Sequence, residues 1–260
     1  MSKWNLDAFP NTLLSVSNPK TMKGEKDGYL TAIMHLAPHK LSGANLCAFA
    51  SAGCAAACLN TAGQGGMALD EDGLNRVQVA RIQRSRLFRR DRKVFFNMLI
   101  TEIEKFIKKA ETKGMTPAIR LNGTSDIPWE KIAADEKGRN IFQIFPNTQF
   151  YDYTKYPIDK RGTLPSNYHL TFSLSEDNDE IAFHALSNAV NVAVVLNVKR
   201  SGDIPITWNF LGRDYPVVDG DKTDLRFLDP LYGGIVALRG KGTIKRREEG
   251  MKAGFIREAS

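Results

Sequence analysis

The chain has 260 residues, of which 42% are hydrophobic and 25% are charged. This balance excludes a disordered chain, a collagen and a coiled coil, and it favours a single domain over 1–260. The 36 lysines and arginines outnumber the 29 acidic residues and give a formal net charge of +7, which favours an anionic partner such as a nucleic acid or nucleotide. No apolar run reaches the roughly 18 residues of a membrane span, and the first residues lack the layout of a signal peptide, so we expect a cytoplasmic protein without a membrane partner.

The chain begins with an irregular segment, followed by a strand and a loop. Residues 1–28 are polar and punctuated by glycine and proline, which predicts an N-terminal arm with little core of its own. The run 29–36 is mostly apolar, has the length of a strand and stops before Pro38. Residues 41–67 are largely Gly, Ala, Ser, Cys and Asn. Side chains this small build no core but let the backbone wrap closely around a ligand, which predicts a ligand-binding loop.

A long helix is predicted over 75–113, because no glycine or proline occurs there before Gly114. The acidic run 70–72 precedes it, where negative charge suits the positive end of a helix dipole. The second half has one apolar face, made by Phe95, Leu99, Ile103, Phe106 and Ile107. The first half is strongly cationic, with Arg76, Arg81, Arg84, Arg86, Arg89, Arg90, Arg92 and Lys93. This cationic run is either a solvated helical face or a contact surface for phosphates.

Short apolar runs alternate with helical or turn-rich segments beyond Gly114. The apolar runs lie at 118–121, 140–145, 168–174, 190–197 and 234–238, and the predicted helices among them at 129–134 and 179–188. This alternation predicts an α/β fold with a parallel sheet and crossover helices, arranged as an incomplete barrel or as an open doubly wound sheet. Residues 201–233 contain three prolines and predict an excursion from the rhythm. Residues 241–260 are predicted to form a basic C-terminal tail, in which we expect the stretch 245–247 to be a mobile edge.

The three cysteines of the chain are Cys47, Cys54 and Cys58, all within twelve residues. An odd number of cysteines in a reducing compartment argues against a disulfide framework and indicates metal or cluster ligation. Three thiolates from one loop can hold three irons of a [4Fe-4S] cluster and leave the fourth iron open. Zinc is the competing ligand, with His35 or His39 completing a site of three cysteines and one histidine, although the six-residue gap after Cys47 fits zinc poorly. Structural cysteines that bind no metal are the third alternative.

The cysteine loop, placed after a first strand and before a helix and alternating strands, resembles the radical S-adenosylmethionine (SAM) superfamily. More narrowly, the chain resembles the phage proteins named after mycobacteriophage gene product 88. This resemblance rests on Leu46-Cys47, Gly53-Cys54 and Cys58, the arginine-rich helix, Arg120 with Gly123-Thr-Ser-Asp126, and Tyr153-Thr-Lys155. The chain departs from the superfamily in cysteine spacing, which is usually three and then two intervening residues, and in Ala57, which replaces a common aromatic.

The superfamily resemblance implies an incomplete (βα)6-type parallel barrel over 29–240 with a [4Fe-4S] cluster on the three cysteines. SAM would chelate the open iron, and an electron donor would drive its cleavage to methionine and a 5′-deoxyadenosyl radical that abstracts a substrate hydrogen. SAM would lie across the carboxyl ends of the strands. The residues expected to contact SAM follow the second, fourth and fifth strands: Gly123, Thr124, Ser125 and Asp126; Ser173, Ser175 and Glu176; Asn197 and Lys199. For each of them, an ordinary strand-end cap or turn is the alternative.

Two functions follow from these features. The first is a radical SAM-type enzyme that modifies an anionic substrate, with the cationic helix and tail helping to hold that substrate. The second is a non-catalytic nucleic-acid-binding protein in which zinc or an iron-sulfur cluster only stabilises the loop after the first strand.

Overall fold

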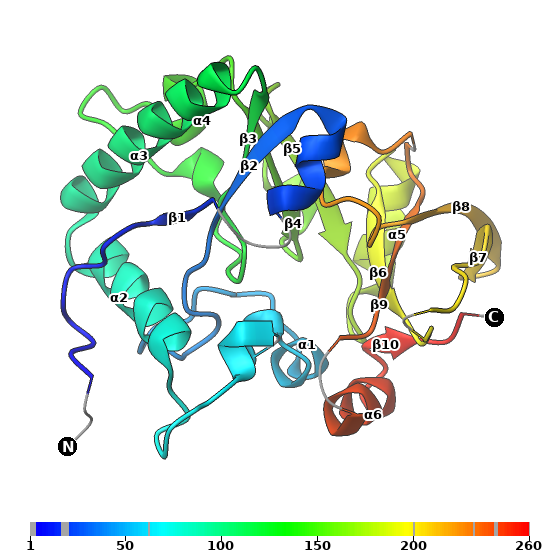
Figure 1. Cartoon of the computed structure of the whole chain (residues 1–260). Coiled ribbons are helices and arrows are strands. Elements are labelled where there is room, and N and C mark those ends of the chain that lie inside the picture. The colour runs from blue at the N-terminus through cyan, green and yellow to red at the C-terminus, as the bar shows by residue number, and fades with distance from the viewer. Residues whose placement is uncertain are drawn as a thin grey trace. The chain divides into compact units, whose positions relative to one another are not determined.

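The computed structural model describes residues 4–16, 21–61, 63–199, 201–230, 232–241 and 244–259, which form a mixed α/β fold (Figure 1). Ten strands within these ranges have the hydrogen-bonded order β1-β2-β3-β4-β5-β6-β9-β8-β7, and β10 pairs with β6. The sheet is mostly parallel and is not closed, because β1 and β7 stand at the two ends of this order. The expected α/β class with a parallel sheet is confirmed.

The chain divides into two compact units. The first unit comprises Met1–Ala48, Asn60–Asp152 and Thr163–His169. The second unit comprises Phe49–Leu59, Tyr153–Gly162 and Leu170–Ser260.

The first unit is built on β1 (Leu14–Ser15), β2 (Tyr29–Met34), β3 (Thr116–Arg120) and the start of β4 (Gln149–Thr154). Its helices are the 3-10 turns η1 (Thr21–Asp27), η3 (Gly63–Gly66) and η4 (Trp129–Lys131) and the α-helices α2 (Arg76–Arg90), α3 (Arg92–Thr112) and α4 (Ile141–Ile144). A further 3-10 turn, η2 (Leu59–Thr61), begins at the boundary. β2 and β3 pair in parallel, β3 pairs in parallel with β4, and β1 is antiparallel to β2.

The predicted long helix is two helices that meet at Asp91. Asn75 caps α2 by accepting a hydrogen bond from the Gln78 N–H, and the Asp91 carboxylate starts α3 by accepting one from the Val94 N–H. The chain changes direction at this break (Figure 1). The acidic run 70–72 precedes α2, whose first turn contains no acidic residue. Asp70 forms a turn instead, accepting hydrogen bonds from the N–H groups of Asp72 and Leu74.

The core of the first unit lies under α3, as its spacing predicts. Phe95, Leu99, Ile103 and Phe106 are buried. The rings of Phe88, Phe95, Phe96 and Trp129 pack against one another, mostly edge to face.

The N-terminal arm contributes to this core, contrary to the expectation for 1–28. Leu13 is fully buried and Leu14 is 7% exposed. The buried Arg84 guanidinium donates from Nε to the Thr12 carbonyl at 2.6 Å. The Glu102 carboxylate accepts hydrogen bonds from the N–H groups of Leu13 and Leu14 at 2.8–3.0 Å. α2 and α3 therefore hold the arm beside β2 through its own backbone groups.

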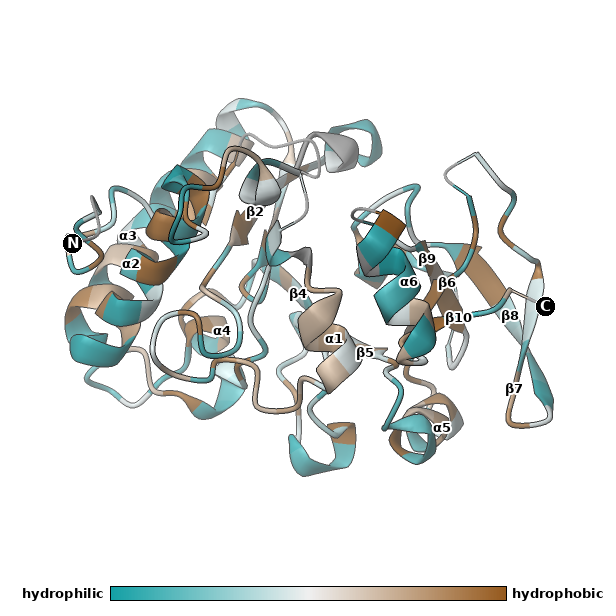
Figure 2. Ribbon diagram, turned by 90° about the horizontal axis from the view of Figure 1, so that it is seen from below, coloured by the Kyte–Doolittle hydropathy of each residue, from teal (hydrophilic) through white to brown (hydrophobic). Residues whose placement is uncertain are grey.

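The second unit contains α1 (Ala52–Ala56), the remainder of β4, and β5 (Tyr168–Ser173), which begins in the first unit. Beyond them lie η5 (Ile158–Lys160), α5 (Asp179–Ser187), β6 (Val192–Leu196), β7 (Thr207–Phe210), β8 (Arg213–Asp219), η6 (Arg226–Leu228), β9 (Ile235–Arg239), α6 (Ile244–Lys252) and β10 (Ile256–Arg257). β6 pairs in parallel with β5, β9 and β10. Apolar residues of β5, β6 and β9 (Figure 2) pack against Ala182, Ala185 and Leu186 of α5.

Several predicted segments differ from the structure. Residues 140–145 form α4 and not a strand, because Asn140 and Gln143 make a capping box, and the neighbouring strand is β4. Residues 129–134 contain only the single turn η4. The segment 201–233 is an excursion as predicted, formed by the antiparallel hairpin of β7 and β8. Within the predicted basic tail, Ile244–Lys252 form α6 and Ile256–Arg257 form β10.

No helix in the part of the chain that the structure describes is both long enough and apolar enough to cross a bilayer.

We expect Glu102→Ala to lower the free energy of unfolding by about 1–3 kcal/mol, because two partly buried backbone N–H groups lose their charged acceptor. Urea unfolding measures this decrease, and hydrogen exchange of the Leu13 and Leu14 amides locates it. Glu104→Ala, at an exposed position of the same helix, is the matched control. Equal stability of the two variants would contradict a role for Glu102 in holding the arm.

Candidate cofactor site

The segment after β3 is tied to the segment after β2 in the first unit. The Gly123 N–H donates to the Met34 carbonyl at 2.9 Å. A Cβ atom at Gly123 would lie 2.6 Å from that carbonyl oxygen and 2.8 Å from Ile33 Cγ2, so only glycine fits this approach. The Thr124 hydroxyl donates to the Leu36 carbonyl at 2.5 Å. The predicted SAM-binding segment 123–126 therefore begins in close contact with the end of β2.

Asn122 organises the turn that follows β3, although no sequence pattern singled it out. Its side-chain oxygen accepts hydrogen bonds from the Ser125 hydroxyl, the Ile127 N–H and the Trp129 indole N–H, at 2.9–3.0 Å. Ser125 is 8% exposed, and its hydroxyl serves this turn. The hydroxyls of Thr124 and Ser125 thus both donate hydrogen bonds to other atoms of the protein.

A buried carboxylate, Asp152, joins the ends of β3 and β4. Asp152 is fully buried and accepts hydrogen bonds from the Asn122 N–H at 2.7 Å and from the Tyr168 hydroxyl at 3.0 Å. Arg120 Nε lies 3.9 Å from its Oδ1, which supplies the opposite charge that a buried carboxylate needs. No sequence pattern identified Asp152 and Tyr168 either, since only the fold brings them close to Arg120.

Cys47 lies against the predicted SAM-binding segment. The Asp126 N–H donates to the Leu46 carbonyl at 2.9 Å, and Cys47 and Asp126 form an isolated parallel bridge. The Cys47 thiol donates to the Thr124 carbonyl at 3.6 Å. The structure therefore brings the first predicted cluster ligand and the 123–126 segment together in one unit.

Cys54 and Cys58 lie on and just after α1 in the second unit. Ser51 caps this helix, and its hydroxyl oxygen accepts a hydrogen bond from the Cys54 N–H at 3.1 Å. Cys54 is in the helix, whereas Cys58 follows the C-cap residue Ala57 and is outside it. Both are partly exposed, and none of the three cysteines, which all fall within the described ranges, is in a disulfide.

Glu176 fixes the start of α1. Its carboxylate accepts a hydrogen bond from the Ser51 hydroxyl at 2.7 Å and one from the Gly53 N–H at 2.5 Å. A Cβ atom at Gly53 would lie 2.8 and 2.9 Å from the two carboxylate oxygens, so glycine is required for this contact. Burial acts to raise the pKa of Glu176, but the hydrogen bonds from Ser51 and Gly53 and the charge of Lys155 hold that pKa below its ordinary value of 4.5.

The C-terminal segment packs on α1 and Glu176. The Cβ position of Gly53 is 2.9 Å from Phe255 Cβ, and that of Gly250 is 3.6 Å from Ala57 Cβ. Arg257 donates from Nη2 to the Ser175 carbonyl at 2.9 Å and to the Asp179 carboxylate at 2.6 Å. Residues of the predicted basic C-terminal tail therefore belong to the surroundings of the second and third cysteines.

The remaining predicted SAM contacts lie around the ends of β5 and β6. The Ser173 hydroxyl accepts a hydrogen bond from Lys155 Nζ, and the Ser175 hydroxyl donates to Asp177, each at 2.8 Å. The Asn197 amide donates to Glu258 at 3.3 Å. Lys199 is exposed. Of these four residues, Ser173, Ser175 and Asn197 have protein partners that stabilise the strand ends and the C-terminal segment.

The side chains of the three cysteines have the chemistry that cluster ligands need. Three thiols in a segment of small residues are a suitable donor set for iron or zinc. Across the described ranges, however, no three His, Cys, Asp or Glu side chains are grouped so that they could hold a metal ion. The first unit contributes Cys47 alone, and the second contributes Cys54 and Cys58.

The cationic run of α2 divides into buried anchors and exposed charges. Arg81 donates from Nη1 to the Asn60 carbonyl and side-chain oxygens, both at 2.6 Å. Arg84 binds the arm, and burial lowers its pKa while the charge of Glu102 acts to raise it. Arg86 pairs with Asp7 at 2.9 Å. Arg81 and Arg84 are buried and bind backbone groups of a loop and of the N-terminal arm. They therefore belong neither to a solvated helical face nor to a contact surface for phosphates.

Comparison with known proteins identifies the family. The model of the gene product 88 family matches residues 12–258, and the chain belongs to this phage protein family. No curated protein and no solved structure matches the chain. The family resemblance read from the cysteine loop, the arginine-rich helix and the 123–126 segment is therefore confirmed.

The pH dependence of Glu176 gives a test of its hydrogen bonds to α1. Because its folded pKa lies below 4.5, these bonds are present above that pH and break as the pH falls through the folded value. We expect the labelling of Cys54 by a dithiodipyridine reagent, measured relative to Cys47 by mass spectrometry, to rise in this acid range.

Glu176→Gln should raise the Cys54 labelling ratio at neutral pH and remove the acid step. Glu180→Gln, at an exposed position of the same unit, should behave as the wild type. A wild-type acid step that persists in Glu176→Gln would contradict the assignment.

Proposed function

We propose that this member of the phage gene product 88 family is a radical SAM-type enzyme that modifies an anionic substrate, such as a nucleic acid or nucleotide, in the host cytoplasm. The observation that carries the proposal is the position of Cys47, whose thiol contacts Thr124 in the segment expected to meet SAM. The other two thiols of the chain follow within eleven residues, on a segment of small side chains.

Cys47, Cys54 and Cys58 are the ligands that we propose for a [4Fe-4S] cluster. When bound, the cluster and SAM together supply the one-electron cleavage of SAM that an external electron donor drives. The chain supplies the positions of the thiols. Glu176 and Ser51 hold the N-terminus of α1, and Cys47 must exchange its hydrogen bond to the Thr124 carbonyl for the metal.

The order of the strands supports a radical SAM-like incomplete barrel. β2, β3, β4, β5, β6 and β9 follow one another in the sheet in chain order. A doubly wound sheet reverses its strand order at a switch point, and these six strands do not reverse. The order turns back only after β9, where β8 pairs in parallel with β9 and β7 follows it. We therefore propose that these six strands correspond to the (βα)6 series, with β1 and the β7–β8 hairpin as additions.

The surroundings of the candidate residues refine their proposed roles. We propose that the backbone of Gly123 and the side chain of Asp126 face the SAM amino group, because the hydroxyls of Thr124 and Ser125 donate to the protein. We propose that Glu176 positions α1 rather than contacting SAM. Lys199 is exposed and suits a carboxylate or phosphate.

The test is anaerobic reconstitution with iron and sulfide, followed by metal analysis and absorption spectroscopy. We expect about four irons per chain, and production of 5′-deoxyadenosine when the reduced protein is incubated with SAM. Cys47→Ser, Cys54→Ser and Cys58→Ser should each lower the iron content and abolish the product. Ala55→Ser, an exposed position of the same helix, should retain both.

Three results would contradict the proposal. Stoichiometric zinc without iron would favour the structural metal site of a nucleic-acid-binding protein. An absence of any bound metal would favour structural cysteines. An intact cluster without SAM cleavage would contradict the enzymatic function and support only the proposed cluster ligands.

The anionic substrate makes a separate prediction for α2. Arg76 and Arg89 are exposed, whereas Arg84 is buried and holds the arm. We expect Arg76→Gln with Arg89→Gln to weaken retention on single-stranded nucleic acid and to reduce the salt slope by about 0.7 for each phosphate that is no longer neutralised. Lys108→Gln with Lys113→Gln removes the same charge elsewhere as a control. Equal retention of the two double variants, measured by salt titration, would indicate that the exposed arginines of α2 form a solvated face and do not contact the nucleic acid.

A further inference from the structure

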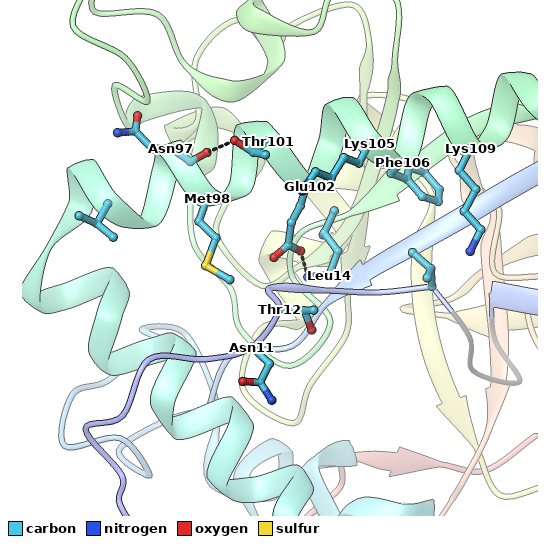
Figure 3. Close-up of a pocket in the computed structure, with 12 residues that line it drawn as sticks. Asn11, Thr12, Leu14, Asn97, Met98, Thr101, Glu102, Lys105, Phe106 and Lys109 are labelled. Carbon is cyan, nitrogen blue, oxygen red and sulfur yellow. Dashed lines mark hydrogen bonds between the residues drawn. The ribbon is translucent and has the colours of Figure 1, made fainter.

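A pocket lies beside α3 in the first unit, and none of the predicted cluster or SAM residues is among those that line it (Figure 3). Its volume is about 680 Å³, within the range of small-molecule pockets. The walls come from the N-terminal arm at Asn11, Thr12, Leu14 and Val16, and from α3 at Val94, Asn97, Met98, Thr101, Glu102, Lys105, Phe106 and Lys109. The α3 side extends over about 22 Å at 1.5 Å per residue, which makes the pocket long.

Apolar side chains dominate its lining. Leu14 and Phe106 are buried, and Val16, Val94 and Met98 add aliphatic surface that is partly accessible or exposed. Figure 3 shows Met98 extending from α3 towards the arm. Methionine adapts its shape to varied hydrocarbon surfaces. The pocket therefore suits a flexible apolar chain better than a rigid polar molecule.

The charged groups at the pocket leave a positive balance. The Glu102 carboxylate is already engaged by the N–H groups of Leu13 and Leu14. Lys105 and Lys109 lie one helical turn apart on α3 and line the pocket. The side-chain ammonium group of neither lysine has a hydrogen bond or ion pair with the part of the chain that the structure describes. Their ammonium groups are complementary to an anionic head.

We propose that this pocket binds a linear aliphatic carboxylate, with the hydrocarbon chain against Leu14, Met98 and Phe106 and the carboxylate near Lys105 and Lys109. The two charges and the apolar lining occur in one elongated cavity, which a free phosphate or an uncharged alkane would match only in part. The proposal does not depend on the radical SAM-type function, because the two sets of residues do not overlap.

The probe is dodecanoate, added below its micellar concentration to protein labelled with ¹³C at the methionine methyl groups. Nuclear magnetic resonance then follows the Met98 signal, which its disappearance in Met98→Leu assigns. We expect saturable shifts of this signal with dodecanoate and weaker binding of dodecanol, which has the same chain without the charge. Acetate, which has the charge without the chain, should not shift it.

Two variants separate the two parts of the site. Lys105→Gln with Lys109→Gln should weaken dodecanoate binding by about three- to tenfold through removal of two exposed ion pairs. Lys108→Gln with Lys113→Gln, which does not line the pocket, is the charge-matched control and should bind as the wild type. Thr101→Trp, an exposed position at the pocket wall, should fill the cavity and abolish the shift.

Any of four outcomes would overturn the proposal. These are the absence of a Met98 shift, equal affinity for dodecanol and dodecanoate, dodecanoate binding that survives Thr101→Trp, and equal affinity in the two lysine double variants. A Met98 signal that changes with protein concentration alone would instead assign this surface to a second copy of the chain.

Discussion

The hydrogen bonds of the Glu176 carboxylate to Ser51 and Gly53 are the constraint on which the cysteine segment depends. α1 has only five residues, and a helix so short is unstable by itself. Glu176 follows β5 and lies 123 residues from Gly53, so the sheet of the second unit sets where α1 starts. A side chain at Gly53 would separate the two groups, which explains why glycine stands directly before Cys54.

The elements with a long or strong pattern could be predicted from sequence, and those defined by a distant partner could not. β2, β6 and β9 are buried apolar runs, and the sequence predicts each close to its bounds. The apolar face of α3 is predicted too, but the break at Asp91 that separates α3 from α2 is not. α4 was mistaken for a strand because its apolar run is short, although Asn140 and Gln143 carry a capping-box signal that could have identified it. β10 has two residues and exists only through its pairing with β6, for which the sequence offers no signal.

The candidate site shows the same division. Gly123 and the cysteines could be selected because glycine and thiol have special geometry and chemistry. The role of Asp152 could not be predicted from the sequence, because its partners Asn122 and Tyr168 lie 30 and 16 residues away and contact it only in the fold. Arg81 resembles any cation of a charged helix in the sequence. In the structure it is buried, because the loop beside α2 presents carbonyl groups rather than apolar surface.

The C-terminal segment completes the second unit around α1 rather than extending from it. Phe255 approaches Gly53, Gly250 approaches Ala57, and Arg257 binds Ser175 and Asp179 on either side of Glu176 in sequence. The last residues of the chain thus stabilise the same strand end that holds the cysteine helix. The predicted basic tail is part of this structure because its apolar and small residues pack on α1 and its Arg257 pairs with Asp179.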